Sequence, residues 1–217
     1  MKSSNIFKIL CRLFINQYYT FIMKIVFYII YIILITNLSA STTDEKKKLF
    51  EEACNDGKTI SCYNLGLMYD YGDGAIDEDD EKALGYYIKA CNKNYFESCS
   101  RAAVLYEEGK NIKEDMNEAF KLYSKACGGE DAFGCHNVAI YYGKRKTQAM
   151  KNISIGFYNK ACNGGYAPSC IYLGRMYRDS KTLSHDYMLA KEKFNLACEA
   201  NNALGCKELR ILEEAGY

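Results

Sequence analysis

The spacing of the cysteines constrains this chain more than any other feature. Ten of the eleven cysteines form pairs whose members are eight positions apart: Cys54 and Cys62, Cys91 and Cys99, Cys127 and Cys135, Cys162 and Cys170, Cys198 and Cys206. Within one continuous helix, residues eight apart are separated by about 12 Å along the axis. A disulfide needs Cα atoms within about 7 Å. If the two cysteines of a pair bond to each other, the chain must therefore turn back between them, as in a helical hairpin.

The residues around each pair favour helices on both sides of the turn. An alanine precedes every first cysteine, and an aromatic residue stands four positions before it: Phe50, Tyr87, Tyr123, Tyr158 and Phe194. Spacings of four and eight mark one face of a helix. The residue before each second cysteine is serine or glycine, which suits a helix N-cap. We therefore expect each second cysteine to open a helix, and the periodic alanines and aromatics to form the core.

The first cysteines recur every 35 to 37 residues, a period typical of an α-solenoid with two helices per unit. The fold class expected is all-α, an α/α solenoid of about five hairpins over residues 41–217. Arg210 and Glu213 break the pattern in the last unit, which predicts a polar C-terminal cap. Helices are expected at 44–54, 62–70, 79–91, 99–108, 115–127, 135–142, 147–162, 170–178, 186–198 and 206–214.

These residues resemble a known family. The stretches ALGYYIKACNKNYFESC, AFKLYSKACGGEDAFGC and SCIYLGRMY are similar to the Sel-one-like repeat (SLR), and the cysteine pair in each unit is similar to the Helicobacter cysteine-rich proteins. The resemblance covers residues 44–217. It implies a TPR-like superhelix, residence in the periplasm or outside the cell, and one disulfide in each repeat: 54–62, 91–99, 127–135, 162–170 and 198–206. It also implies a penicillin-binding or weak β-lactamase activity.

The first forty residues predict a secretory signal peptide. Met23 and Lys24 precede an eleven-residue apolar run, and Leu38-Ser39-Ala40 offers a cleavage site. We expect Met23 to be the true start and cleavage to follow Ala40, which removes Cys11 and leaves an even number of cysteines. The alternative is an uncleaved anchor, although the run is shorter than the roughly 20 residues a spanning helix needs. The location expected is secreted or periplasmic, in a bacterium.

Composition and motifs limit the other ligands. The first forty residues hold four basic and no acidic side chains, so the rest has 24 basic against 27 acidic residues, which argues against nucleic acid. No glycine-rich phosphate loop occurs, so no cofactor is predicted. No metal site is predicted, because zinc cysteines usually lie two to four residues apart or have histidine partners, and only His136 and His185 exist. The acidic stretch 69–82 lacks EF-hand spacing.

Two functional hypotheses follow. The first is a monomeric scaffold whose concave face binds a protein or peptide segment, as solenoids commonly do. Tyrosines outside the periodic positions suit such a surface: Tyr71, Tyr86, Tyr95, Tyr141, Tyr166 and Tyr172. The second is a slow β-lactamase or penicillin-binding protein with a β-lactam or peptidoglycan-like ligand. It rests on the resemblance alone, because Ser-x-x-Lys is absent after residue 40, and no catalytic residue is identified.

Overall fold

The computed structural model describes residues 25, 26, 28, 29, 32, 42–74, 76–145, 147–179 and 186–217. Within them every regular element is a helix, apart from an isolated bridge between Asp73 and Ile76. A helix over residues 42–55 comes first. It is followed by α2 (Thr59–Tyr71), α3 (Asp80–Cys91), α4 (Phe96–Glu108), α5 (Met116–Gly128), α6 (Ala132–Gly143), α7 (Gln148–Asn163), α8 (Ala167–Asp179), α9 (Tyr187–Glu199) and α10 (Ala203–Glu214).

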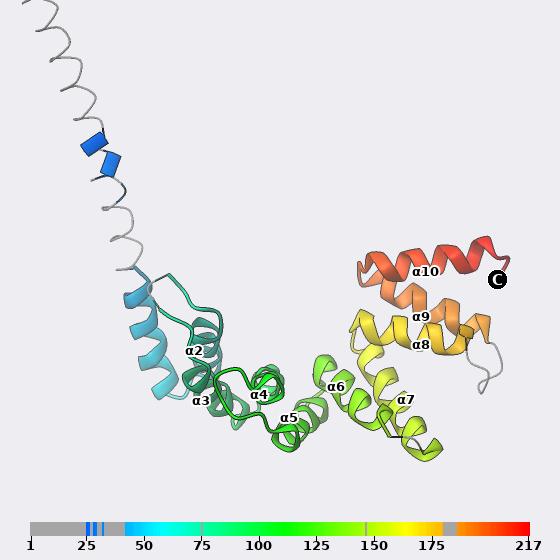
Figure 1. Cartoon of the computed structure of the whole chain (residues 1–217), viewed down its shortest axis with the longest axis horizontal. Coiled ribbons are helices and arrows are strands. Elements are labelled where there is room, and N and C mark those ends of the chain that lie inside the picture. The colour runs from blue at the N-terminus through cyan, green and yellow to red at the C-terminus, as the bar shows by residue number, and fades with distance from the viewer. Residues whose placement is uncertain are drawn as a thin grey trace, which may run out of the picture.

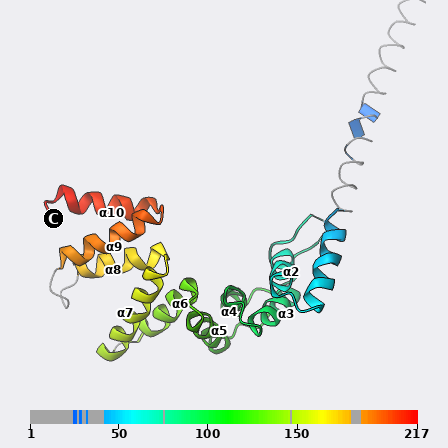
Figure 2. The same cartoon turned by 180° about the vertical axis from the view of Figure 1, so that it is seen from behind.

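The helices follow one another along an arc (Figure 1). Helix 42–55 and α2 lie in one arm, α8 to α10 lie in the other, and α5 and α7 lie at the outer margin of the bend. Figure 2 shows the same order from behind, with α4 and α6 on the inner side of the curve. We call α2, α4, α6, α8 and α10 the inner helices, and helix 42–55, α3, α5, α7 and α9 the outer helices. The predicted all-α solenoid is confirmed.

A disulfide closes the turn between each outer helix and the inner helix that follows it. The bonds join Cys54 to Cys62, Cys91 to Cys99, Cys127 to Cys135, Cys162 to Cys170, and Cys198 to Cys206. Their Cα–Cα distances are 4.4 to 4.8 Å. The structure therefore has the five pairings that the spacing and the family resemblance led us to expect.

The same backbone turn precedes every inner helix. The third residue after the first cysteine has a positive φ: Gly57, Asn94, Glu130, Gly165 and Asn201. The amide that follows it donates to the carbonyl of the alanine before the first cysteine, as Tyr95 does to Ala90 at 3.1 Å. This is the Schellman geometry, which ends a helix on a left-handed residue.

The expectation that each second cysteine opens a helix is wrong. Each of them is the fourth residue of its inner helix: Cys62, Cys99, Cys135, Cys170 and Cys206. The turn residue with positive φ already completes the reversal, so the chain becomes helical three residues before the cysteine. Where a side chain caps the inner helix, it comes earlier than expected, as Asp131 does in accepting from the amide of Gly134.

The serine or glycine before each second cysteine is small because two helices approach closely there. A Cβ on Gly205 would lie 2.5 Å from the Cβ of Ala197, and one on Gly134 would lie 2.7 Å from that of Ala126. Both alanines belong to the preceding outer helix. These positions therefore serve packing across the turn and not capping.

The periodic residues form the core, as predicted. The aromatics four positions before a first cysteine are buried from the second unit onward: Tyr87, Tyr123, Tyr158 and Phe194. Two of them lie directly against a glycine of the preceding inner helix. A Cβ on Gly66 would lie 2.4 Å from the ring of Tyr87, and one on Gly174 would lie 2.5 Å from that of Phe194. Glycine is required at these two positions because the ring occupies the space of a side chain.

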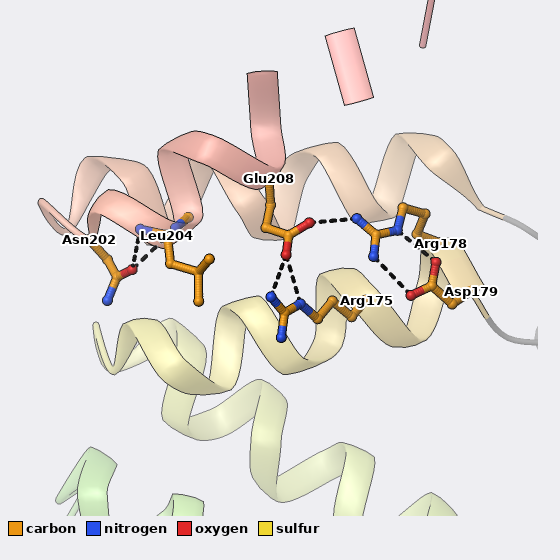
Figure 3. Close-up of polar contacts among 7 residues, drawn as sticks. Arg175, Arg178, Asp179, Asn202, Leu204 and Glu208 are labelled. Carbon is orange, nitrogen blue, oxygen red and sulfur yellow. Dashed lines mark hydrogen bonds and ion pairs between the residues drawn. The ribbon is translucent and has the colours of Figure 1, made fainter. Parts of the chain in front are cut away.

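An ion-pair cluster joins α8 to α10 in the C-terminal arm (Figure 3). Glu208 of α10 is buried and accepts hydrogen bonds from two arginines of α8: Arg175 Nε at 2.8 Å and Arg178 Nη1 at 2.5 Å. Arg178 also pairs with Asp179 and lies 5.6 Å from the centre of the Phe194 ring. Burial opposes ionisation of Glu208, but the arginine hydrogen bonds outweigh it and lower its pKa.

The predicted signal peptide lies almost entirely outside the described residues, and so do Cys11 and the cleavage site after Ala40. The signal peptide and its cleavage stay predictions. None of the described helices is long and apolar enough to cross a membrane.

Candidate functional site: the inner face

The side of the inner helices that faces away from the outer helices forms the candidate site. It consists of the positions two before and two, five and nine after each second cysteine. We call these positions the inner-face row, and between α2 and α8 they are Ile60, Asn64, Leu67, Tyr71, Glu97, Arg101, Val104, Glu108, Phe133, Asn137, Ile140, Lys144, Pro168, Tyr172, Arg175 and Asp179. All are half-buried or exposed, whereas the positions between them pack against neighbouring helices.

Apolar or aromatic side chains occupy eight of the sixteen positions of the inner-face row, and polar or charged side chains occupy the other eight. Leu67, Val104 and Ile140 share the position five after the cysteine. Asn64, Arg101 and Asn137 share the position two after it. An exposed surface that combines apolar patches with a line of hydrogen-bonding groups is suited to hold an extended polypeptide.

A groove of about 370 Å³ opens between α4 and the start of α6. It is lined by Glu97, Ser100, Arg101, Val104, Asp131 and Phe133. A second groove, of about 380 Å³, lies between helix 42–55 and α2, and Leu67 and Asn64 line it. The inner-face row therefore offers hollows on both α2 and α4.

The two carboxylates that line the groove between α4 and α6 already accept hydrogen bonds from other residues of the protein. Glu97 Oε1 accepts from the hydroxyl of Tyr63 at 2.5 Å. Asp131 Oδ1 accepts from the hydroxyl of Ser100 at 2.5 Å and from the amide of Gly134 at 2.6 Å. These contacts join α2 to α4 and α4 to α6. Burial and the contact with Glu97 raise the pKa of Tyr63 to about 12, so its hydroxyl stays a donor at neutral pH.

Arg101 contacts tyrosine hydroxyls instead of a carboxylate. Its Nη1 donates to the hydroxyl of Tyr71 at 2.6 Å, and its guanidinium lies 5.9 Å from the centre of that ring. Burial opposes its charge, but the surrounding tyrosines Tyr71 and Tyr63 outweigh it, and the pKa of Arg101 is raised. In the described part of the chain, Arg101 makes no ion pair.

His136 packs between helices. Its Nδ1 lies 2.8 Å from the hydroxyl of Ser169, and its ring packs against those of Tyr158 and Tyr166. Burial lowers the pKa of His136, which favours the neutral ring at pH 7. Ser169 is 0% exposed. A substrate could not reach that hydroxyl, so this serine and histidine contact serves packing of α6 against α8.

The acidic stretch 69–82 is used for local structure. Asp79 caps α3 through the amide of Lys82, and Asp80 accepts from Asn111 at 2.7 Å. Asp73 pairs with Lys46 at 3.0 Å. The described residues contain no cluster of three or more histidine, cysteine or acidic side chains arranged to hold a metal. His185 lies outside the described residues.

Five of the six tyrosines outside the periodic positions pack against other rings: Tyr86 on Tyr69, Tyr95 on Tyr63, Tyr141 on Phe120, Tyr166 on Phe133, and Tyr172 on Tyr158. Tyr71 and Tyr172 lie on the inner-face row, 61% and 45% exposed. Sequence alone suggested an aromatic recognition surface but could not separate these two from the rest.

Comparison with family models identifies four Sel1 repeats, at residues 59–95, 96–129, 132–166 and 167–202. The matched repeats begin at the inner helices, so each contains one inner helix and the outer helix that follows. The bonds from Cys91 to Cys99, Cys127 to Cys135 and Cys162 to Cys170 therefore join consecutive repeats. They reinforce the interfaces between repeats.

Among curated proteins, the chain is similar to cytochrome c oxidase assembly factor 7 of Xenopus tropicalis. The two are 32% identical over 158 residues, which cover 65% of this chain and 68% of the relative. The relative of Homo sapiens is 27% identical over 124 residues, covering 54% and 52% of the two chains.

Solved structures show the same fold. A protective antigen of uropathogenic Escherichia coli with an SLR fold gives a TM-score of 0.68 at 22% identity, covering 78% of this chain and 36% of that one. A Sel1 repeat protein of Oxalobacter formigenes gives 0.67 at 23%, covering 75% and 66%. Cysteine-rich protein B of Helicobacter pylori is 22% identical, covering 74% of this chain and 95% of that one, but its TM-score of 0.30 gives no support to the shared fold. The family assignment rests on the four repeats.

Proposed function

This chain belongs to the Sel1 repeat family, and we propose that it binds an extended segment of another protein along the inner face of α2, α4, α6 and α8. The fold is a protein-binding scaffold, and the inner-face row supports this use of it. The observation that carries the proposal is the pair of hollows on that row, where apolar side chains alternate with polar groups.

The disulfides indicate a non-reducing compartment, because cytosolic thiols are normally kept reduced. We propose that the protein reaches it as a secreted or periplasmic protein by a signal peptide cleaved after Ala40. The hydrophobic segment before Ala40 supports this route. Intact-mass analysis of protein expressed from its full reading frame tests it. A mature chain beginning at Ser41 with all ten remaining cysteines oxidised is expected, and retention of the segment would overturn the proposed route.

The relatives named cytochrome c oxidase assembly factor 7 support a role beside other proteins. By this analogy, we favour a scaffold that assists the assembly of a protein complex. The β-lactamase or penicillin-binding alternative stays a prediction of the family resemblance. Nitrocefin hydrolysis and retention of labelled penicillin by oxidised protein would test that alternative directly.

Selection from a random phage-displayed peptide library on oxidised full-length protein tests the scaffold function. Selected peptides should bind in fluorescence anisotropy, and Val104→Asp on the inner-face row should weaken binding at least about tenfold. Gly156→Ser on α7 is the matched control, because Gly156 is exposed and a Cβ there would meet nothing within 4 Å. Equal loss in both variants, or no selected peptide at all, would contradict an inner-face site.

A further inference from the structure

The arginines of the inner helices differ in what they contact. Arg175 and Arg178 both donate to Glu208, a carboxylate that the chain itself supplies from the next inner helix. Arg101 lines a hollow and donates to the hydroxyl of Tyr71 at 2.6 Å. From the next inner helix, the hollow beside Arg101 is lined by Phe133 and by the N-cap residue Asp131. Neither forms an ion pair with Arg101 in the described part of the chain.

The carboxylates near Arg101 are engaged elsewhere. Glu97 stands one turn before it on the same helix, but bonds to Tyr63 on α2. Asp131 is held by Ser100 and by the amide of Gly134. Asp70 accepts from the hydroxyl of Tyr87 at 2.8 Å. A guanidinium has five N–H donors in a planar fork, so Arg101 keeps donors for a ligand.

We infer that Arg101 recognises the side-chain carboxylate of an aspartate or glutamate in the bound segment, with an adjacent apolar side chain seated on Val104 and Phe133. This inference rests on the proposed scaffold function and names the chemistry of its partner. The charge is complementary, and partial burial of the guanidinium strengthens a paired contact relative to one in water. Val104 and Phe133 line the same groove as Arg101.

A side chain within a continuous segment fits the site better than a free C-terminus. The inner-face row continues on both sides of Arg101, with a second hollow toward helix 42–55 and the apolar Ile140 on α6. A segment that follows the row past α4 therefore has chain on both sides of the carboxylate.

The test uses oxidised full-length protein and synthetic fluorescent peptides from the library selection. Peptides with an Asp or Glu beside a leucine should bind, and replacement of that residue by Asn or Gln should weaken binding to the unmodified protein roughly tenfold or more. Peptides that end at the acidic residue with an amidated terminus, or that carry only a free terminal carboxylate, separate the two sources of the anion. Tight binding of the latter alone would overturn the assignment to a side chain.

Arg101→Gln should remove the preference for the acidic peptide over its amide counterpart, whereas Arg210→Gln, on the exposed surface of α10, should preserve it. Arg101→Lys keeps the positive charge without the planar guanidinium and should retain part of the preference. This second variant tests the inference even if Arg101→Gln fails to fold. Selected peptides that bind without any acidic preference, or with one that Arg101→Gln leaves intact, overturn this inference while the scaffold function stands. Failure of every peptide to bind would overturn both.

Discussion

The hydroxyl of Tyr87 donates to the carboxylate of Asp70 at 2.8 Å, joining the outer and inner helices of the first matched repeat. Tyr123 makes the equivalent bond to Glu107 at 2.8 Å in the second repeat. In the fourth repeat the ring is Phe194, which has no hydroxyl, and the facing residue is Arg178. In these three repeats the partner changes with the ring: a carboxylate faces a hydroxyl, and a cation faces a bare aromatic. In the third repeat the ring is Tyr158, and the position that corresponds to Asp70 is Gly143.

Loss of this hydroxyl should destabilise the first repeat. Tyr87→Phe leaves Asp70 without its donor, and we expect the free energy of unfolding to fall by about 1–2 kcal/mol in urea denaturation. Burial raises the pKa of Asp70, while the Tyr87 bond lowers it. Without the bond the folded-state pKa of Asp70 rises further above the unfolded-state pKa. Stability is then lost as the pH rises from the unfolded-state pKa through the folded-state pKa. The loss should therefore be larger at pH 7 than at pH 3. Tyr172→Phe, at an exposed ring, is the control and should change little.

Addition of a methyl group to Gly66 should be costly. The new Cβ would lie 2.4 Å from the buried ring of Tyr87, and such overpacking costs about 1–3 kcal/mol. Gly85 on α3 is exposed, and a Cβ there would meet nothing within 4 Å, so Gly85→Ala should stabilise by about 0.5–1 kcal/mol. Opposite signs for these two substitutions in chemical denaturation are the expected result. A neutral Gly66→Ala would contradict the close approach of α2 and α3.

Replacement of Glu130 by glycine should stabilise the third turn. Glu130 has φ +69°, where the corresponding residues are glycine or asparagine. A side chain in this region costs about 1–2 kcal/mol, partly offset by the entropy that glycine loses on folding. We expect a net gain of about 0.5–1 kcal/mol by differential scanning calorimetry or urea denaturation. Glu114→Gly, at an exposed residue in a different turn, should bring no such gain.

Removal of one interior disulfide should weaken the interface between two repeats. Each bridge closes a loop of about nine residues, so replacement of Cys127 and Cys135 by alanine should cost about 2.5 kcal/mol on chain-entropy grounds. Urea unfolding followed by tyrosine fluorescence measures the change. Replacement of Cys198 and Cys206, which fix only α10, provides the comparison. Because the interior pair couples repeats on both sides, its removal should broaden the transition more; an equally sharp transition for both would argue against that coupling.

Acid should loosen the C-terminal arm. The hydrogen bonds from Arg175 and Arg178 hold the pKa of Glu208 below its ordinary value of 4.5. A carboxylate with a lowered folded-state pKa contributes stability above its unfolded-state pKa and loses it as the pH falls through the folded value. Glu208→Gln should therefore lower stability by about 1–2 kcal/mol at pH 7 and by much less at pH 3. The same deficit at both pH values would show that the charge of Glu208 contributes nothing.

The repeat architecture could be predicted because it depends on local and periodic patterns. The eight-residue cysteine spacing demands a turn, and the alanine and aromatic positions recur at helical intervals, so the hairpins and their buried faces follow from the sequence. The helix starts could not be predicted equally well. Gly134 and Gly205, which precede Cys135 and Cys206, have the composition of caps, but their small size serves contacts with a helix on the other side of the turn.

The sequence by itself determined the solenoid, its phase and its core, because each repeat meets its neighbours through the same few positions. Only the tertiary structure decided which charges are satisfied. Glu208 pairs with Arg175, which lies 33 residues away in the sequence, and Glu97 accepts a hydrogen bond from Tyr63, which lies 34 residues away. Such pairings depend on the curvature that places successive inner helices side by side, which no local pattern encodes. That curvature leaves Arg101 with donors facing the groove.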